Sequence, residues 1–170
     1  MNSIALTLGS AAVLLLSSPV FADLQVAFIE GAPKDRFIIR NTSNCDLGPA
    51  DLVIDFAGSD AGLIFDVTGA GAGVEVFQPF EVTAGAQYLA TQPVISDGDQ
   101  RATLNMTGLG TKETIAFTID VDDTNGTRAI TVADSEMSGT TVSLIARDNA
   151  YSAVMATSAT VVLDVAACDE

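Results

Sequence analysis

The sequence predicts an all-β fold, a single antiparallel β-sandwich with immunoglobulin-like, Greek-key connections. Two observations predict it. Short segments in which apolar and polar residues alternate recur from Leu24 onward, rich in Val, Ile, Phe and Thr and bounded by Gly, Asp, Asn or Pro. Outside the first 22 residues, no segment of comparable length has the spacing of an amphipathic helix. Eight or nine short strands separated by turn signals are typical of two packed antiparallel sheets.

The predicted strands share apolar side chains at every second position, which places those side chains on one face. In the second strand, Phe37 and Ile39 are expected to face the core, between the outward Arg36 and Arg40. The predicted strands cover residues 24–30, 35–41, 51–57, 62–67, 73–78, 102–106, 113–121, 140–147 and 159–165.

The chain begins with a predicted secretory signal peptide over residues 1–22. An apolar run from Ile4 to Leu16 is followed by the small residues Val20 and Ala22, so we expect cleavage after Ala22. The run is too short for an ordinary membrane span, although the absence of Lys and Arg before it keeps a retained anchor as the alternative. Residues 23–170 then form one β-sandwich domain, secreted or periplasmic and without a stable membrane span.

The charge of the chain is strongly acidic, with 22 Asp and Glu against 7 Lys and Arg and a formal net charge of −15. Nucleic acids and anionic lipids are bound through Lys and Arg, so the charge argues against both as partners. The acidity has two explanations, adaptation to a salty exterior and the binding of divalent cations.

Cys45 and Cys168 are the two cysteines of the chain. In an exported protein an even number of cysteines predicts a disulfide. The bond would close a loop of about 120 residues, for which chain entropy gives about 5 kcal/mol as an upper value. No CxxC motif is present, so the predicted role is structural.

Three stretches carry a resemblance to a known family: EGAPKDRFIIRN, GLIFDVTGAGAGVEVFQPFEV and FTIDVDDT, which begin at Glu30, Gly62 and Phe117. The chain resembles small exported proteins of Gram-negative bacteria labelled "aggregation factor core", over nearly the whole mature sequence. The resemblance implies a secreted, β-rich protein of a Gram-negative bacterium with an adhesive role. It brings no catalytic or binding residues with it.

The composition argues against an enzyme. The chain has no His, which is the usual general base of hydrolases and the commonest zinc ligand, and it has no Walker loop, GxSxG or GxGxxG motif. Two carboxylates alone could serve a glycosidase. Sugar cleavage usually also uses aromatic platforms, and the chain has no Trp and two Tyr.

The segment DVDDTNG is the candidate metal site. Asp120 and Asp122 are expected on the outer face of their strand, with Asp123 at the start of the loop and Asn125 following. Ca²⁺ takes six to eight oxygen ligands, which suits this composition. An EF-hand register fails because it places Val121 and Val132 at ligand positions.

Further ligands must therefore come from other loops. Asp66 and Glu75 are the candidates named for the metal. Two further acidic pairs are also considered: Glu30 with Asp35, around the GAPK turn, and Asp134 with Glu136. The alternative is a solvated strand end, because Asp and Asn are common there for local hydrogen bonding.

The function expected from these features is a non-enzymatic exported β-sandwich that acts by surface contact, in adhesion or aggregation at a cell surface or matrix, with calcium as its one candidate cofactor. Its partner would be a protein or a cell surface. The alternative is a soluble periplasmic module that binds a small ligand or a partner peptide.

Overall fold

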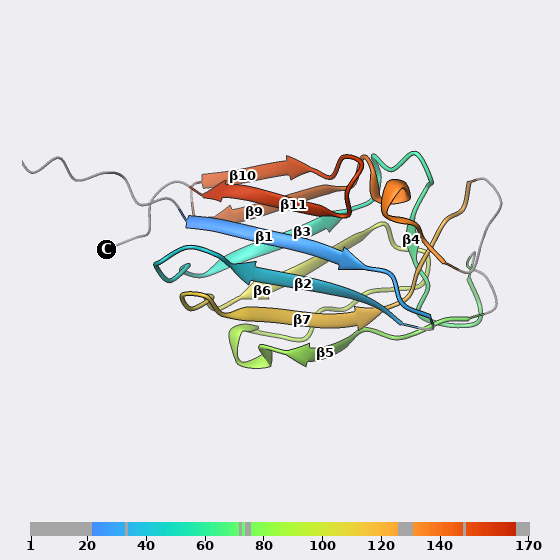
Figure 1. The fold of residues 1–170 in the computed structure, drawn as a ribbon. Helices are drawn as coiled ribbons and strands as arrows, with labels where there is room; N and C mark the ends of the chain where they lie inside the picture. Colours follow the sequence, from blue (N-terminus) through green and yellow to red (C-terminus); the bar gives the residue numbers. More distant parts are fainter. Residues whose placement is uncertain are drawn as a thin grey trace, which may run out of the picture.

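The computed structural model describes residues 22–32, 34–71, 73, 76–125, 131–147 and 149–165. Within these residues the protein is all-β with antiparallel sheets, as the alternation predicted (Figure 1). The predicted signal peptide lies outside them except for Ala22, where the first strand begins. No helix in this part of the chain is long and apolar enough to cross a membrane.

Two larger sheets are built from pairs of strands that are mostly distant in sequence. The first sheet has the order β11-β1-β2-β7-β5, formed by β11 (Thr160–Val165), β1 (Ala22–Ile29), β2 (Asp35–Asn41), β7 (Thr114–Ile119) and β5 (Glu81–Ala84). The second has the order β10-β9-β3-β6, formed by β10 (Asn149–Val154), β9 (Thr141–Ala146), β3 (Ala50–Asp55) and β6 (Arg101–Met106).

A short two-stranded ribbon joins β4 (Ile64–Phe65) to β8 (Val121–Asp122), and two 3₁₀ helices, η1 (Ala86–Tyr88) and η2 (Asp134–Met137), lie in the connections. The ribbon lies at the end of the molecule where β7 finishes and β2 starts (Figure 1). This end is therefore where segments from several parts of the chain meet.

The inner faces of the two large sheets enclose one hydrophobic core. The alternation along β2 is visible in its burial, since Phe37 and Ile39 are fully buried while Arg36 and Arg40 are exposed. The ring of Phe117 stacks on that of Phe37, with centroids 5.1 Å apart, and also packs against the ring of Phe80, with centroids 4.7 Å apart. These aromatic contacts fix the register of β2 against β7 near the ribbon end.

The strand predictions were wrong in four places. Residues 62–67 form a strand only at Ile64–Phe65, and the described residues of the predicted strand 73–78, which are 73 and 76–78, are not in a strand. Two strands were missed, β5 and β10, because both lie at sheet edges and bury few of their side chains. An edge strand without a buried face carries no alternation to detect.

Candidate metal centre

The ribbon end is held together by backbone hydrogen bonds between three segments. The backbone amide of Asp66 donates to the carbonyl of Asp120 at 3.1 Å. The amide of Gln78 donates to the carbonyl of Asp66 at 3.2 Å, and the amide of Asp120 donates to the carbonyl of Gln78 at 3.2 Å. In the ribbon, Phe65 pairs with Val121. These contacts place Asp66, just after β4, against the segment that carries Asp120 and Asp122.

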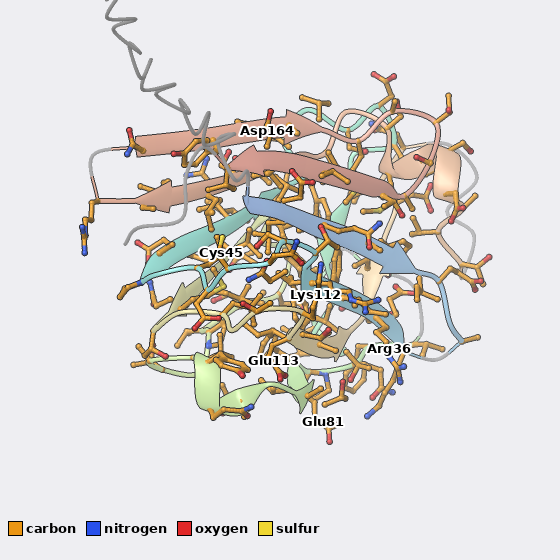
Figure 2. The ribbon with its side chains drawn as sticks, turned by 60° about the vertical axis from the view of Figure 1, so that its left-hand side comes forward. Arg36, Cys45, Glu81, Lys112, Glu113 and Asp164 are labelled. Atoms are coloured by element: carbon orange, nitrogen blue, oxygen red, sulfur yellow. The ribbon has the colours of Figure 1, made fainter. Side chains whose placement is uncertain are left out.

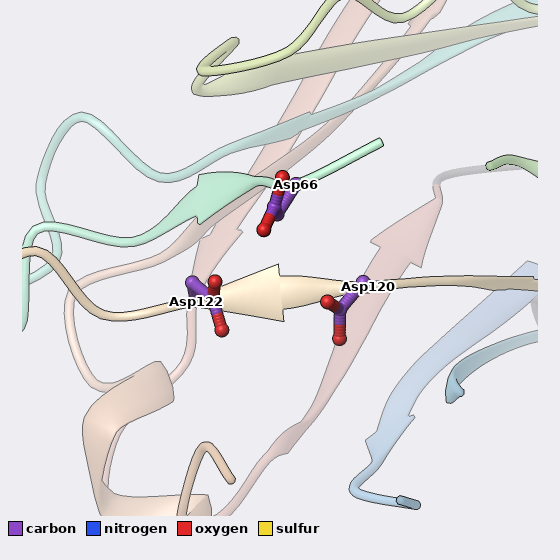
Figure 3. A group of neighbouring side chains, drawn as sticks. All are labelled: Asp66, Asp120 and Asp122. Atoms are coloured by element: carbon purple, nitrogen blue, oxygen red, sulfur yellow. The ribbon is translucent and has the colours of Figure 1, made fainter. Parts of the chain in front are cut away.

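The carboxylates of Asp66, Asp120 and Asp122 meet at this point (Figure 3). Each can offer one oxygen such that the three oxygens lie within 4.8 Å of one another. All three residues are buried, with exposed fractions of 3%, 7% and 2%. Three carboxylate oxygens at this spacing could all ligate a single hard cation.

The structure thus brings together three of the six residues predicted for the metal. Asp123 follows β8 and is also buried. Asn125 is exposed and its side-chain amide donates to the carbonyl of Asp60, so this group is engaged in the neighbouring turn. Glu75 lies outside the described residues.

The expectation of an outward, solvated face for Asp120 and Asp122 was wrong. The alternation of β7 does continue inward through Ile119 and Val121, but the opposite face is not open to water here. The ribbon strand β4 and the backbone of Gln78 pack against this segment and bury it. Long-range pairing of this kind leaves no local mark in the sequence.

Burial changes the acid strength of these groups. Desolvation, with the neighbouring Asp122 carboxylate adding repulsion, raises the pKa of Asp120 to about 7. The pKa of Asp66 is also raised to about 7, first by desolvation and then by its contacts with Asp97 and Asp122. Neither Asp66 nor Asp120 has a Lys or Arg partner in the described part of the chain, where the ion pairs are Lys34 with Glu81 and Arg101 with Asp55.

Two of the three converging carboxylates have a buried oxygen without a hydrogen-bond partner among the described residues. Asp66 Oδ1 and Asp120 Oδ2 are buried and have no hydrogen-bond partner among the described residues. Such an oxygen costs free energy unless a proton or a cation compensates it, and native proteins leave few of them. Both oxygens belong to members of the converging group of three aspartates.

A glycine closes the site on one side. A Cβ atom built on Gly73 would overlap the carboxylate of Asp66 and approach Asp122 Oδ2 to 2.5 Å. Only a residue without a side chain lets the backbone come this close to the two acids. Gly73 was expected to begin a strand, and its contact with the acids was not foreseen.

Asp35 belongs to the same end but uses its oxygens differently. It is buried, and its carboxylate accepts hydrogen bonds from the amides of Gly31 and Val121 at 3.1 and 3.0 Å. Burial raises its pKa to about 6, against the lowering effect of these two bonds. Asp35 thus contacts the segment between two candidate ligands without being one of the three converging acids.

The composition of the cluster suits a hard cation. Carboxylates grouped around one point, with no cationic side chain paired to Asp66 or Asp120 among the described residues, are typical of sites for hard cations such as Ca²⁺.

Cys45 lies far along the chain from this site, in the turn that follows β2 (Figure 2). It is half-buried, and its sulfur is 3.5 Å from Ser43 Oγ. Cys168 lies outside the described residues, so the disulfide stays a prediction.

The fold and site define an all-β protein with a buried acidic cluster at one end. Comparison of the chain with family models, with curated proteins and with solved structures gave no match.

Proposed function

We propose that this protein is an exported, non-enzymatic β-sandwich that binds a divalent cation, Ca²⁺ in preference to others, and acts by surface contact. The observation that carries the proposal is the convergence of Asp66, Asp120 and Asp122. In two of them, Asp66 and Asp120, a buried carboxylate oxygen has no hydrogen-bond partner among the described residues. Ca²⁺ accepts irregular oxygen geometry, whereas Mg²⁺ demands an octahedral shell and keeps several waters. A buried, crowded site therefore favours Ca²⁺.

The cation site lies beside exposed apolar residues, which supports a contact function. Val76 and Phe77 are 39% and 44% exposed, and the next residue, Gln78, is bonded through its backbone to both Asp66 and Asp120. A cation held by the acids would fix Gln78 and thus the two exposed side chains before it. Exposed apolar groups held rigidly are the usual centre of a protein contact.

The finer architecture belongs to the same proposal. In the first large sheet β2 pairs with β7, and in the second β3 pairs with β6. Each pair joins a strand from the first half of the chain to a strand from the second half, which supports an immunoglobulin-like, Greek-key sandwich. A signal peptide over residues 1–22 and a Cys45–Cys168 disulfide fit export to the periplasm or beyond. The partner would be another protein or a cell surface, in adhesion or aggregation.

The proposal is tested by melting curves of residues 23–170 in calcium, in magnesium and in chelator, each at two ionic strengths, with light scattering on the same samples. We expect calcium to raise the melting temperature at both ionic strengths, by mass action on the folded state. We expect scattering to grow only with calcium. A rise that sodium chloride alone reproduces would show that the acids need only charge screening, and the cation site would be rejected.

A pocket supports the alternative function, a soluble periplasmic module for a small ligand or a peptide. It lies beside the edge strand β5, measures about 420 Å³ and combines the apolar Phe80, Val82 and Leu89 with the polar Glu81 and Gln92. This volume falls in the range of small-molecule sites, about 300 to 1,000 Å³. A monomer whose state is indifferent to calcium, and which is stabilised by a compound bound beside β5, would favour this module.

A further inference from the structure

Asp35 is the first residue of β2, and its side chain continues the β2–β7 ladder beyond the last backbone pair. In the register of the two strands, Asp35 lies opposite Ile119. Two residues further on, the amide of Val121 donates to Asp35 Oδ2 at 3.0 Å. The Asp35 carboxylate therefore accepts the hydrogen bond of the Val121 amide, where a backbone carbonyl of a neighbouring strand would otherwise do so.

The anchored amide lies between two candidate ligands. Val121 separates Asp120 from Asp122 in sequence, is 2% exposed, and pairs with Phe65 of β4 on its other side. Without the Asp35 carboxylate, this buried amide would lose its acceptor, and the folded position of the segment would be destabilised. The segment 120–122 is thus held between Asp35 on one side and β4 on the other.

The second carboxylate oxygen of Asp35 accepts a hydrogen bond from the connection between β1 and β2. Oδ1 accepts the amide of Gly31 at 3.1 Å. Asp35 is 4% exposed, and its negative charge lies close enough to those of Asp120 and Asp122 to repel them. A fixed charge beside an acidic cluster is unfavourable without a cation, and it attracts a cation to the neighbouring site.

We propose that Asp35 is the positioning residue of the cation site: it holds Asp120 and Asp122 in ligating positions through the Val121 amide, and it links occupation of the site to the β1–β2 turn at Gly31. This inference rests on the proposed function. It is carried by the two hydrogen bonds of Asp35 and by the buried oxygens of Asp66 and Asp120 that lack hydrogen-bond partners among the described residues. Asp35 does not belong to the group of oxygens within 4.8 Å of one another, so it acts through its neighbours.

The test compares Asp35→Ala and Asp35→Asn with the control Asp55→Asn in the mature protein. Asp55 also accepts a backbone amide, that of Ala57, but it lies on β3 in the other large sheet and pairs with Arg101. The probes are Ca²⁺ by calorimetry and Tb³⁺ by luminescence lifetimes in H₂O and D₂O, which count the waters on the bound ion.

We expect Asp35→Ala to weaken Ca²⁺ binding about 10- to 100-fold, the range for residues that orient metal ligands. We also expect more waters on the bound Tb³⁺, because the ligands are no longer held. Asp35→Asn retains an oxygen for the Val121 amide and should fall between Asp35→Ala and the wild type. Asp55→Asn should leave affinity and water count unchanged.

Hydrogen exchange in the wild type provides a second measurement, independent of whether the Asp35 variants fold. We expect Ca²⁺ to slow exchange of the Gly31 amide together with that of Val121. Unchanged Gly31 exchange on calcium binding would overturn the link to the turn. An unchanged Ca²⁺ affinity and water count in Asp35→Ala would overturn the positioning role. The variant Asp122→Asn, which alters a proposed ligand, serves as a further comparison. If Asp35→Asn loses as much Ca²⁺ affinity as Asp122→Asn does, Asp35 is itself a ligand and the positioning role is also overturned. If the wild type itself shows no saturable binding of Ca²⁺, the proposed function fails first.

Discussion

At the scale of single residues, three aspartates dominate the ribbon end. In water each would be ionised at neutral pH, but desolvation opposes ionisation of Asp66 and Asp120 at this site. Without a cation, the folded protein must either protonate these groups or bear their repulsion. With a cation, the same burial strengthens the attraction because few water molecules screen it. The identity of the compensating charge therefore decides the stability of this end.

Removing two of the acids should separate cation binding from stability. We expect Asp122→Asn combined with Asp123→Asn to lose the stabilisation by calcium while its calcium-free melting temperature stays equal or rises, because repulsion is relieved. At calcium 100 times above its dissociation constant, the loss is about 2.7 kcal/mol, or about 5–10 °C in a domain of this size. Differential scanning calorimetry with and without calcium measures both quantities.

The matched control removes two acids that face each other elsewhere. Asp23 and Asp164 are register partners on β1 and β11, so Asp23→Asn with Asp164→Asn removes the same number of negative charges from facing positions away from the ribbon. Asp164 is labelled in Figure 2. This variant should keep the full response to calcium. A calcium response in the Asp122/Asp123 variant as large as in the control would contradict the site.

At the scale of elements, the β4–β8 ribbon forms the framework of the site. Its two paired positions, with the backbone bonds among Asp66, Gln78 and Asp120, hold three distant segments together. Gly73 approaches from a fourth segment, where a side chain would strike the acids. The site therefore depends on backbone positions as much as on the acids themselves.

Gly73→Ala tests this dependence. The added methyl group must displace the Asp66 and Asp122 carboxylates or move the backbone away from them, so we expect calcium affinity to fall at least about tenfold. Gly98→Ala is the control: a Cβ at Gly98 meets nothing within 4 Å, although its positive φ of 81° makes some loss of stability expected there. Calcium titration of both variants checks the difference. Equal affinities in the two variants would show that the close approach at Gly73 has no role in binding.

Much of the fold was predictable because buried strands alternate. The inward residues of β1, β2, β3, β6 and β7 were identified in this way, and the structure buries them. The edge strands β5 and β10 were not found because they present few buried side chains. For the site, Asp120, Asp122 and Asp66 were named from their residue types, but their burial depends on pairing across more than 50 residues, which the sequence does not display.

At the scale of the whole molecule, the raised pKa values predict an unusual pH dependence. The folded-state pKa values of Asp35, Asp66 and Asp120 lie at about 6, 7 and 7, above the ordinary value of 3.8. The folded state therefore binds more protons than the unfolded state between about pH 4 and pH 7, and stability without calcium falls as the pH rises through this range.

The acids with lowered pKa values act in the opposite direction and at lower pH. Asp55 is held ionised by Arg101 and Asp97 by the amide of Thr68, so their contribution is lost as the pH falls through about 4 and below. We expect the calcium-free protein to be most stable near pH 4–5, and saturating calcium to remove the decline toward pH 7. Urea unfolding across this pH range, with and without calcium, measures the free energy of unfolding. A maximum of this free energy near pH 7 without calcium would contradict the raised pKa values.

The predicted disulfide also acts on the whole chain, because it would join the turn after β2 to the C-terminal region. We expect Cys45→Ser to lower the free energy of unfolding by up to about 5 kcal/mol while leaving calcium affinity unchanged. Urea unfolding and a thiol titration of the wild type check this. Two reactive thiols in the unfolded, unreduced wild type would exclude the bond.

The most direct test of the central claim is a calorimetric titration of the mature protein with calcium at pH 7 and physiological ionic strength. The account predicts saturable binding of one Ca²⁺ per chain at the acidic cluster, weaker binding of Mg²⁺, and loss of the signal in the Asp122→Asn, Asp123→Asn variant. Heat that never saturates, or that persists in this variant, would show that the buried aspartates do not form a cation site.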